Sequence, residues 1–456
     1  MNKSFWQQNS KTPHFPNLDQ DLNVDILIIG GGLSGAMVSY YLKESTYKIA
    51  VIEKNQFGSH SSGHSTAKIT CLHGLILQQI AQSYNYEQAY LYYLSNKEAM
   101  QDIEHIISKE QIDCDFQKNT AYIYTDDKQK LKILKKEKSL LKSFGEKIIE
   151  KNDHLMTFGL ENQAIFDPIR YLYRIIEICQ SYHIDFYENA QATAVHRYRD
   201  HYLVKVNDHC ITCKYVVHAT RYPFIKKGAY FLKLFQTRSY VDHKSTIQGP
   251  NSYLSIDYSC SYRPVNNSQS LIINNHSSQW FAQDSIALRG IPYIGQYKKN
   301  EYIIYGFQKW GMTLSHVAGK LIRDLILHDH NPYQQLYYCH YFSISNSRKY
   351  LPAMIRNSLQ GYILQRYMTR GLKDLSTNDG TIIKIKHHLY AVYKDSHQKL
   401  HVFSPYCPHL KCIIHFNRKS HTWDCPCHQS VFNAYGQLIE GPSLYSLKKI
   451  VNDKYH

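Results

Sequence analysis

The first strong pattern along the chain is an apolar run followed at once by glycines. Residues 24–29 are almost continuously apolar but too few to cross a membrane, and residues 30–35 read GGGLSG. Apolar positions then recur at helical spacing as far as Tyr40, and residues 48–52 form a second apolar run that ends at Glu53. This pattern predicts a strand, a glycine turn, a helix and a second strand.

That order of elements favours a dinucleotide-binding site. Gly30 permits a tight turn, Gly32 lets a pyrophosphate approach the start of the helix, and Gly35 lets the helix pack closely on the strand. Glu53 ends the second strand, where a carboxylate accepts hydrogen bonds from ribose hydroxyls. The glycines alone would be weak evidence, but with both strands, the helix and the acid they predict a dinucleotide cofactor.

Farther along, helical spacing covers residues 85–109 and 128–148. The second segment is rich in lysine, which favours a solvated helix face over a docking patch for an acidic redox partner. Strand-like runs at residues 202–206, 252–256 and 271–273 predict an antiparallel sheet between the cofactor-binding segments.

Near the C-terminal end, two short loops each offer one thiolate and one imidazole. The four residues are Cys407, His409, Cys425 and His428. One iron can take the two cysteines and a second iron the two histidines, which is the ligand set of a Rieske [2Fe-2S] centre. Zinc accepts the same ligand types around one ion, so these four residues alone leave both centres open.

Four other segments resemble, in the right order, those of the D-amino-acid oxidase and glycine oxidase superfamily. They are residues 58–70, which lie beside the flavin in that family, residues 216–220, which close over the adenine side, and residues 292–295 with 306–313, its C-terminal flavin motif. The resemblance implies FAD rather than a nicotinamide cofactor. Besides the fingerprint, it places these residues at the FAD: Gly63, His64, Ser65, Thr66, Ala219, Thr220, Gly306, Trp310, Gly311 and Met312.

The cysteine and histidine loops resemble those of Rieske proteins. With the flavin segments, nearly the whole chain is similar to FAD-dependent oxidoreductases that carry a C-terminal Rieske domain. This resemblance implies a disulfide between Cys412 and Cys427 that clamps the two loops, and a hydrogen bond from Ser430 to a bridging sulfide. Phe432 replaces a tyrosine that donates to a ligand sulfur in high-potential members, which implies a lower reduction potential.

Three positions depart from glycine in these families. They are Gln308 in the flavin motif and Lys411 and Gln429 in the Rieske loops. If the two loop positions need a positive φ, each side chain costs about 1 kcal/mol or more. At residue 308, a longer side chain can crowd the flavin.

The expected fold is an α/β FAD-binding domain of the Rossmann-like, glutathione-reductase and DAO type, with an interleaved α+β substrate domain and a small all-β Rieske domain. Residues 1–335 form the oxidoreductase domain, with the fingerprint at 24–53 and substrate-domain segments at roughly 80–185 and 236–285. Residues 336–370 are expected to be a linker. Residues 371–456 form the Rieske domain, with strands at 381–385 and 389–393 after a turn at 379–380.

Charge and cysteine content narrow the range of partners. The net charge is +16, but the basic residues are scattered and no nucleic-acid motif is present, so nucleic acid is excluded as a main partner. The excess charge is compatible with acidic proteins or with peripheral association with anionic membranes. With no apolar signal segment and no spanning run, a cytoplasmic location is expected. Cys210 and Cys213 form a C-x-x-C without a second pair and are interpreted as ordinary thiols.

Two redox groups predict an electron path. The chain is expected to oxidise a small amine, amino acid or hydroxy acid at the flavin and to pass electrons through the cluster to an acceptor protein or quinone. The alternatives are a reductase running from cluster to flavin, and a non-catalytic electron-transfer or redox-sensing protein. No catalytic residue is identified; Arg221, Arg238 and Arg263 are weak candidates for a carboxylate anchor, each more simply explained as structural.

Overall fold

The computed structural model describes residues 3–224, 227–273, 279–340, 350–369 and 371–450. The chain divides into two units. The larger unit contains the chain up to Arg221 together with residues 238–345. The smaller unit contains residues 346–456 and, from the first half of the chain, residues 222–237.

A mixed sheet with a parallel centre forms the first layer of the larger unit. Among the described residues it has eight strands, in the order β16-β17-β10-β1-β2-β7, with β9 paired to β10 and β8 paired to β9. Ile26, Leu27 and Ile28 of β1 are fully buried, as expected for a strand covered on both faces. The strands are β1 (Leu22–Ile29), β2 (Ile49–Ile52), β7 (Asp185–Tyr187), β8 (Ala192–Tyr198), β9 (His201–Val206), β10 (His209–Arg221), β16 (Tyr293–Lys298) and β17 (Glu301–Tyr305).

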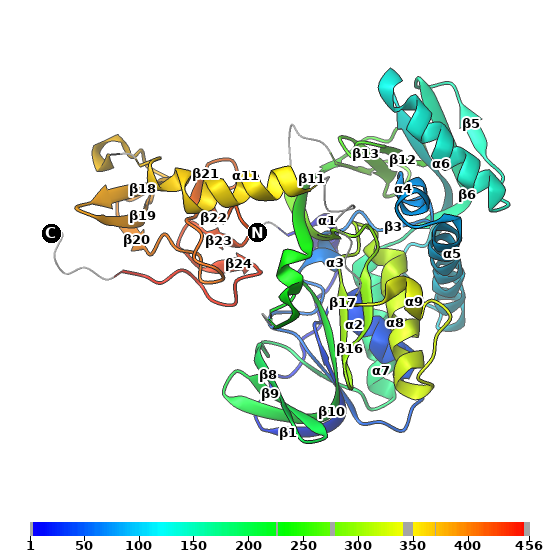
Figure 1. Ribbon diagram of the computed structural model, residues 1–456, viewed down its shortest axis with the longest axis horizontal. Helices are drawn as coiled ribbons and strands as arrows, with labels where there is room; N and C mark the ends of the chain where they lie inside the picture. Colours follow the sequence, from blue (N-terminus) through cyan, green and yellow to red (C-terminus); the bar gives the residue numbers. More distant parts are fainter. Residues whose placement is uncertain (1–2, 225–226, 274–278, 341–349, 370, 451–456) are drawn as a thin grey trace. The chain divides into compact units, whose positions relative to one another are not determined.

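Three helices pack together beside this sheet: α2 (Leu33–Leu42), α7 (Pro168–Ser181) and α8 (Gly311–Leu327) (Figure 1). The start of α7 is well defined, because Asp167 accepts hydrogen bonds from the backbone of Ile169 and Arg170 and Pro168 occupies the first turn. The predicted strand, glycine turn, helix and strand at residues 24–53 are confirmed. Since α7 packs on α2, it belongs to the cofactor layer, although residues 168–181 fall inside the predicted substrate segment 80–185.

A second sheet forms the other layer. In the described part of the chain it has nine strands, in the order β15-β11-β14-β13-β12-β4-β6-β3, with β5 beside β6. They are β3 (Lys68–Ile69), β4 (Gln117–Thr125), β5 (Ile149–Lys151), β6 (Met156–Ile165), β11 (Leu234–Lys244), β12 (Ser252–Ser255), β13 (Ser261–Pro264), β14 (Ser270–Ile273) and β15 (Trp280–Ala287). The assignment of residues 202–206 to this sheet is wrong: β9 pairs with β8 and β10 in the first sheet, because it forms a meander with its sequence neighbours.

Helices cover one end of the second sheet. The predicted helices at 85–109 and 128–148 are confirmed as α5 (Tyr86–Lys109) and as η1 (Lys128–Lys130) followed by α6 (Leu131–Ser143). Leu134 and Leu141 of α6 face inward and are fully buried, and most of its lysines are exposed. The other helices of this unit are α1 (Phe5–Asn9), α3 (Ser61–His64), α4 (Ile76–Ser83) and α9 (Gln334–Tyr337).

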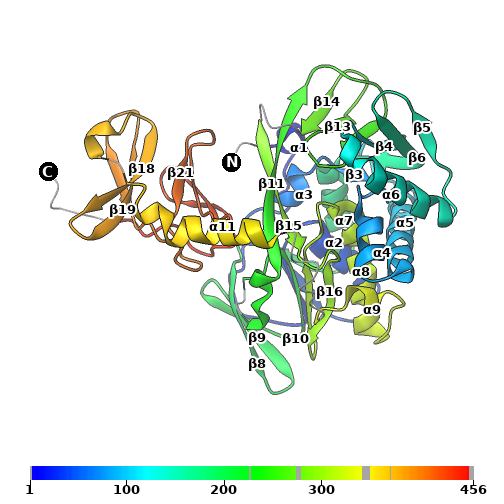
Figure 2. The ribbon, with the colours of Figure 1, turned by 45° about the horizontal axis from the view of Figure 1, so that its top comes forward.

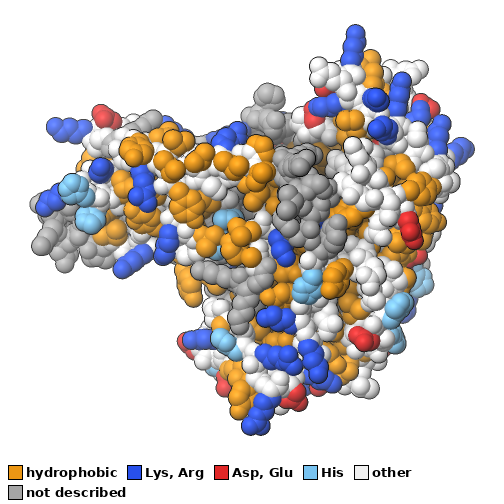
Figure 3. Space-filling model, viewed as in Figure 1, with side chains coloured by type: hydrophobic (Ala, Val, Ile, Leu, Met, Phe, Trp, Pro, Cys, Tyr) orange, Lys and Arg blue, Asp and Glu red, His pale blue; other side chains and the backbone are white. Residues whose placement is uncertain are grey.

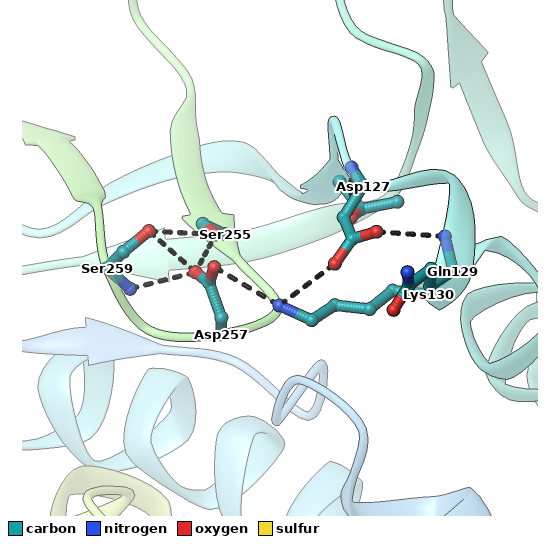
Figure 4. A network of polar contacts seen from close by, with 7 residues as sticks. Asp127, Gln129, Lys130, Ser255, Asp257 and Ser259 are labelled. Atoms are coloured by element: carbon teal, nitrogen blue, oxygen red, sulfur yellow. Dashed lines mark hydrogen bonds and ion pairs between the residues drawn. The ribbon is translucent and has the colours of Figure 1, made fainter.

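A polar network ties the start of α6 to the turn between β12 and β13. Lys130 lies 3.6 Å from a carboxylate oxygen of Asp127 and 3.4 Å from one of Asp257 (Figure 4). Asp257 also accepts hydrogen bonds from Ser255 and from both the backbone and the hydroxyl of Ser259. Burial alone would raise the pKa of Asp257, but these hydrogen bonds lower it, so the carboxylate is ionised. The network links the start of α6 to this turn at the protein surface.

Two small antiparallel sheets build the smaller unit. In the described residues one has three strands, β18 (Asp379–Ile385), β19 (His388–Lys394) and β20 (Leu400–Phe403), and the other has four, β21 (His415–Asn417), β22 (Thr422–Asp424), β23 (Val431–Asn433) and β24 (Leu438–Glu440). The strands predicted at 381–385 and 389–393 are confirmed, while the predicted turn at 379–380 is already part of β18. Trp423, Phe432 and Ile414 are fully buried in their common core.

Residues preceding these sheets are helical. They form α11 (Leu351–Tyr362), η3 (Leu364–Arg366) and η4 (Leu372–Asp374), and α11 runs beside the strand β21 (Figure 2). Part of the expected linker 336–370 therefore packs as a component of the smaller unit, because Gly361 of α11 lies against Cys412 in the loop before β21 and Cys427 in the loop between β22 and β23. Residues 341–349 of that linker lie outside the described residues. Among the helices that the structure describes, none combines the length and apolar composition needed to cross a membrane.

Candidate functional site

The glycine turn after β1 has the geometry that a dinucleotide site requires. Gly30 has a φ of +121°, and a Cβ there would lie 2.5 Å from the carbonyl oxygen of Ala219 on the neighbouring strand β10. A Cβ on Gly35 would collide with the carbonyl oxygen of Gly30, so α2 packs closely on the turn. At Gly32 a Cβ would come near only the hydroxyl of Ser62, which leaves the helix start open to a ligand.

The side chains of Glu53 and Ser62 accept hydrogen bonds from backbone N–H groups around this turn. The Glu53 carboxylate accepts hydrogen bonds from the backbone N–H groups of Gly31 at 2.8 Å and of Asn55 at 3.1 Å. Ser62 Oγ accepts from the N–H of Leu33 at 2.9 Å, in the first turn of α2. Sequence reasoning missed this role of Ser62, because the hydroxyl reaches the start of a helix that precedes it by 29 residues, and no local capping pattern links the two.

The loop predicted to lie beside the flavin forms α3 and the turn after it. A Cβ on Gly63 would meet the carbonyl oxygen of Gly58, and His64 Nδ1 lies 2.8 Å from the carbonyl oxygen of His60. The carbonyl oxygen of Ser65 accepts from the indole of Trp6, and that of Thr66 accepts from Arg263. The carbonyl oxygens of this loop thus accept hydrogen bonds from side chains, which stabilises its backbone conformation.

The C-terminal flavin segment lies between β17 and α8. Gly306 has a φ of +79°, Gly311 begins α8, and Met312 is buried in its first turn. Trp310 stacks on His73 with ring centroids 4.3 Å apart, and its indole nitrogen is buried with no hydrogen-bond partner among the described residues. An orphaned buried donor at this place is consistent with a missing acceptor from a cofactor.

Gln308 adopts the left-handed conformation that its position requires, with a φ of +55°. Its side-chain amide donates to the carbonyl oxygen of Ala287 on β15 at 2.8 Å. The side chain is therefore held against the second sheet. The next residue, Lys309, also has a positive φ, of +75°.

Charged side chains of both signs gather near this segment. Lys309 Nζ lies 2.9 Å from Ser239 Oγ on β11, and Arg221 donates to Ser61 Oγ at 2.7 Å and to the carbonyl oxygen of Gln283 at 3.0 Å. Burial raises the pKa of Asp284 on β15, while Lys309 and Arg221 act in the opposite direction. Sequence reasoning identified Arg221 but missed Asp284 and Lys309, since no local motif links the strands that carry them.

The other two arginine candidates differ in what they contact. Arg238 lies beside Gln283, with its Nε 3.4 Å from the amide oxygen, and so shares this charged region. Arg263 is almost fully buried and donates to the carbonyl oxygens of Pro264, Thr66 and Phe166. Its donors satisfy the backbone, which supports the structural interpretation of Arg263.

In the smaller unit, the two cysteine and histidine loops have matching backbone geometry. The N–H of Lys411 donates to the carbonyl oxygen of Cys407, and that of Gln429 donates to the carbonyl oxygen of Cys425, each at 2.9 Å. Lys411 has a φ of +62° and Gln429 a φ of +58°, so both substitutions for glycine occur at left-handed positions. The predicted disulfide between Cys412 and Cys427 is confirmed.

The four predicted ligands lie together behind this disulfide. Cys407 and Cys425 are buried free thiols hydrogen-bonded to each other, and the rings of His409 and His428 are 5.1 Å apart. The Nδ1 atom of His428 is buried without a hydrogen-bond partner in the described residues, and burial lowers the pKa of this histidine to about 4. Two thiols with two imidazoles, one of them neutral and unpaired, fit a [2Fe-2S] cluster.

Neighbouring residues lower the pKa of one thiol. The hydrogen bond from Cys425, with further bonds from backbone N–H groups and from Ser430, lowers the pKa of Cys407 to about 7. Ser430 Oγ also accepts from the N–H of Ser443 at 3.0 Å, which ties the third loop to the site. Phe432 is fully buried in the core and offers no hydrogen bond there. The sulfurs of Cys412, Cys425 and Cys427 lie within 4.8 Å of one another, but the disulfide leaves only Cys425 free to bind metal.

Residues 222–237 are here called the connecting segment, and aromatic residues at 222 and 231 in it lie beside the histidines. The ring of Phe231 lies 5.9 Å from that of His409 and 6.1 Å from that of His428, and Tyr222 lies 6.1 Å from His409. Gln429 of the second loop donates to the carbonyl oxygen of Gln236 at 2.9 Å. No sequence signal indicated this packing, because about 180 residues separate the connecting segment from the loops.

Comparisons with known proteins agree with both sites. Residues 25–241 match the FAD dependent oxidoreductase (DAO) family, and residues 365–451 match the Rieske [2Fe-2S] domain. The chain is similar to the putative Rieske 2Fe-2S iron-sulfur protein YhfW of Bacillus subtilis, at 28% identity over 98% of this chain and 97% of the relative. It is also similar to gamma-glutamylputrescine oxidoreductase of Escherichia coli, at 26% identity over 31% of this chain and 33% of the relative.

Solved structures give the same fold for the larger unit. Glycine oxidase from Geobacillus kaustophilus matches with a TM-score of 0.60 and 13% identity, over 71% of this chain and 100% of that chain. The DAO domain binds FAD and the Rieske domain binds a [2Fe-2S] cluster. The chain therefore contains a DAO-type FAD-dependent oxidoreductase domain and a C-terminal Rieske [2Fe-2S] domain.

Proposed function

We propose that this enzyme oxidises an amino acid or a closely related small amine and that the electrons leave through the Rieske centre to an external acceptor. FAD supplies the capacity to take two electrons from a substrate, and the cluster supplies single-electron transfer. One observation carries the proposal: the connecting segment packs on the ligand histidines of the smaller unit and is joined by peptide bonds to Arg221 and Arg238 of the larger unit.

Hydrogen bonds and burial stabilise the connecting segment beside the histidines. Tyr222 is 5% exposed, and its hydroxyl lies 3.4 Å from the carbonyl oxygen of Phe231. The hydrogen bond from Gln429 to Gln236 holds the other end of the segment. The aromatic rings beside the two ligand histidines support transfer within the chain, because they limit the approach of a diffusing partner to these histidines.

The charges near the flavin segment support a zwitterionic substrate. Arg221 and Lys309 offer positive charge for a carboxylate, and Asp284 offers negative charge for an ammonium group. A substrate carrying both groups would pair its carboxylate with Arg221 or Lys309 and its ammonium group with Asp284, whereas a plain hydroxy acid has no group for Asp284. The names of the relatives, a glycine oxidase and a gamma-glutamylputrescine oxidoreductase, also favour amino acids and amines. The cytoplasmic location stays a prediction from the sequence.

Anaerobic titration of the purified protein tests the direction of electron flow. A panel of amino acids, amines and hydroxy acids is added while flavin absorbance and the EPR signal of the reduced cluster are followed. We expect an amino acid to bleach the flavin and then to reduce the cluster. If no substrate bleaches the flavin but a reduced carrier protein reduces the cluster first, the protein is a reductase instead.

The role of the connecting segment is tested with a matched pair of variants. Phe231→Ala removes the ring that lies beside both histidines, and Leu232→Ala removes a side chain in the same turn that is 52% exposed. We expect Phe231→Ala to slow cluster reduction after flavin bleaching at unchanged bleaching rate, and Leu232→Ala to leave both rates unchanged. Equal cluster reduction in both variants would exclude the connecting segment from the path.

A further inference from the structure

Helix α11 presents an apolar face to solvent. Leu351, Ile355 and Leu359 recur at helical spacing and are 49%, 51% and 47% exposed. Together with Pro352, Arg356 and Leu364 they line a shallow groove along the helix. The exposed apolar surface continues through Tyr362, Ile363, Leu364, Tyr367 and Met368. Hydrophobic side chains gather over α11, bordered by basic ones (Figure 3). A patch of this extent on a folded protein marks a binding surface.

The opposite face of α11 packs on the cluster loops, so the apolar face is held towards solvent. A Cβ on Gly361 would lie 2.8 Å from the Cys427 sulfur and 2.9 Å from the Cys412 sulfur, so the helix backbone rests on the disulfide of the cluster loops. The carbonyl oxygen of Gly361 accepts from the N–H of Ile413 at 2.8 Å, and the Tyr362 hydroxyl donates to the carbonyl oxygen of Leu410 at 2.8 Å. The exposed face cannot turn inward without breaking these contacts.

Positive charge predominates in the sequence around α11, up to Asp374 in η4. Residues 330–373 contain no Asp or Glu, and their six basic residues are Arg348, Lys349, Arg356, Arg366, Arg370 and Lys373. Of these, Arg356, Arg366 and Lys373 are exposed in the structure. An apolar face bordered by Lys, Arg and Tyr is the composition of helices that lie in the plane of a membrane interface.

We propose that α11 and η3 form a docking surface for an anionic membrane. The apolar side chains would enter the boundary between headgroups and acyl chains, while Arg356, Arg366 and Lys373 pair with lipid phosphates. A second copy of the chain would bring two positive faces together, which disfavours self-association through this surface. Nothing in this helix has the length of a spanning segment, so the membrane is contacted from one side.

Membrane docking also indicates which acceptor the enzyme uses, a step that rests on the proposed function. The disulfide beneath Gly361 clamps the loops that hold the cluster, so a docked α11 holds those loops at the lipid surface. An acceptor dissolved in the membrane, such as a quinone, would then be reduced there. The quinone would take two electrons, delivered singly, and two protons from water to become a quinol.

Vesicle binding of the full-length holoprotein tests the docking surface. The protein is sedimented with phosphatidylcholine vesicles that contain or lack phosphatidylglycerol. We expect binding to the anionic vesicles that is about tenfold stronger than to the neutral ones and that weakens as salt is raised. Binding that ignores lipid charge, or absence of binding to both, would overturn the proposal.

Variants locate the surface. Ile355→Ser with Leu359→Ser, and separately Arg356→Glu with Arg366→Glu, should each reduce anionic binding by about tenfold. Leu400→Ser is the matched control, because Leu400 is 41% exposed in the same unit but lies on β20. Flavin and cluster absorbance show that each variant is folded. If the α11 variants bind like the control, or if they instead dissociate a dimer, the membrane is not the partner of this face.

The acceptor step has its own readout. Substrate-reduced enzyme bound to anionic vesicles should be reoxidised faster when the vesicles contain a quinone. If the enzyme binds the vesicles but quinone does not change its reoxidation rate, the proposed acceptor is wrong and the docking surface stands. If no substrate bleaches the flavin, that result contradicts only the proposed function.

Discussion

Gln429 joins the second cluster loop to the connecting segment: its side-chain amide donates to the carbonyl oxygen of Gln236 at 2.9 Å. Gln429 stands where Rieske proteins place glycine, and its φ of +58° carries the strain that such a substitution brings. The chain thus accepts strain at a position where the side chain makes a contact with a segment from its own first half. Lys411 has the same backbone conformation in the first loop, but its side chain is exposed.

The two loop positions should therefore respond differently to glycine. Lys411→Gly removes left-handed strain and loses no contact, so we expect the smaller unit to gain roughly 0.5–1 kcal/mol after the entropy of glycine is deducted. Gln429→Gly relieves similar strain but loses the bond to Gln236, so it should gain less or nothing. Thermal loss of cluster absorbance measures both. An equal gain in the two variants would show that the bond contributes nothing.

Removal of the disulfide should loosen the cluster loops alone. The bond between Cys412 and Cys427 closes a loop of 15 residues, for which chain entropy predicts about 3 kcal/mol of stabilisation. In the double variant Cys412→Ser, Cys427→Ser we expect the cluster to be lost at a lower temperature while flavin absorbance keeps its melting temperature. Cys339→Ser, at a buried free thiol of the larger unit, is the control. Loss of FAD together with the cluster would contradict this expectation.

The sequence alone predicted the sites whose residues lie within a short stretch of the chain. Gly30 to Gly35 with Glu53, and Cys407 to Cys412 with Cys425 to His428, each occupy a short stretch whose spacing alone defines the turn. Contacts between distant segments were not predictable. The connecting segment, Asp284 beside Lys309, and the placement of β9 all depend on which strands pair, and a strand pattern gives no information on its partner. The expected linker 336–370 includes α11, because Asn331-Pro332 predicts the end of the flavin domain and the apolar periodicity fades after it.

A buried carboxyl group predicts how stability depends on pH. Glu137 of α6 is fully buried and accepts from the backbone N–H groups of Leu77 and Gln78 in the first turn of α4. Burial raises the pKa of Glu137 to about 8, above that of an unfolded glutamate near 4.3. Because the folded state holds the proton more tightly, this stabilisation is complete below about pH 4 and is lost as the pH rises to about 8.

Glu137→Gln should keep the hydrogen bonds without the charge. We expect the variant to melt above wild type at pH 9 and the difference to shrink steadily towards pH 5. Glu150→Gln is a useful comparison, because Glu150 is exposed and its hydrogen bond from Lys138 lowers its pKa, so this carboxylate stays ionised from pH 5 to 9 and the difference from wild type should be small and independent of pH. A constant difference between Glu137→Gln and wild type from pH 5 to 9 would mean that this carboxyl does not titrate in that range.

Two glycines of the flavin domain should separate folding from cofactor binding. A Cβ on Gly35 collides with the carbonyl oxygen of Gly30, so Gly35→Ala must displace α2 and should lower both the melting temperature and the FAD content. On Gly311, a Cβ would meet only the Phe307 ring, at an ordinary 3.5 Å, and alanine suits the first turn of α8. If the flavin lies against Gly311, as the family resemblance implies, Gly311→Ala should lose FAD while the apoprotein melts at or above the wild-type temperature. Full FAD content in Gly311→Ala would remove this residue from the flavin site, and a lowered melting temperature would show that the added methyl group disturbs the helix instead.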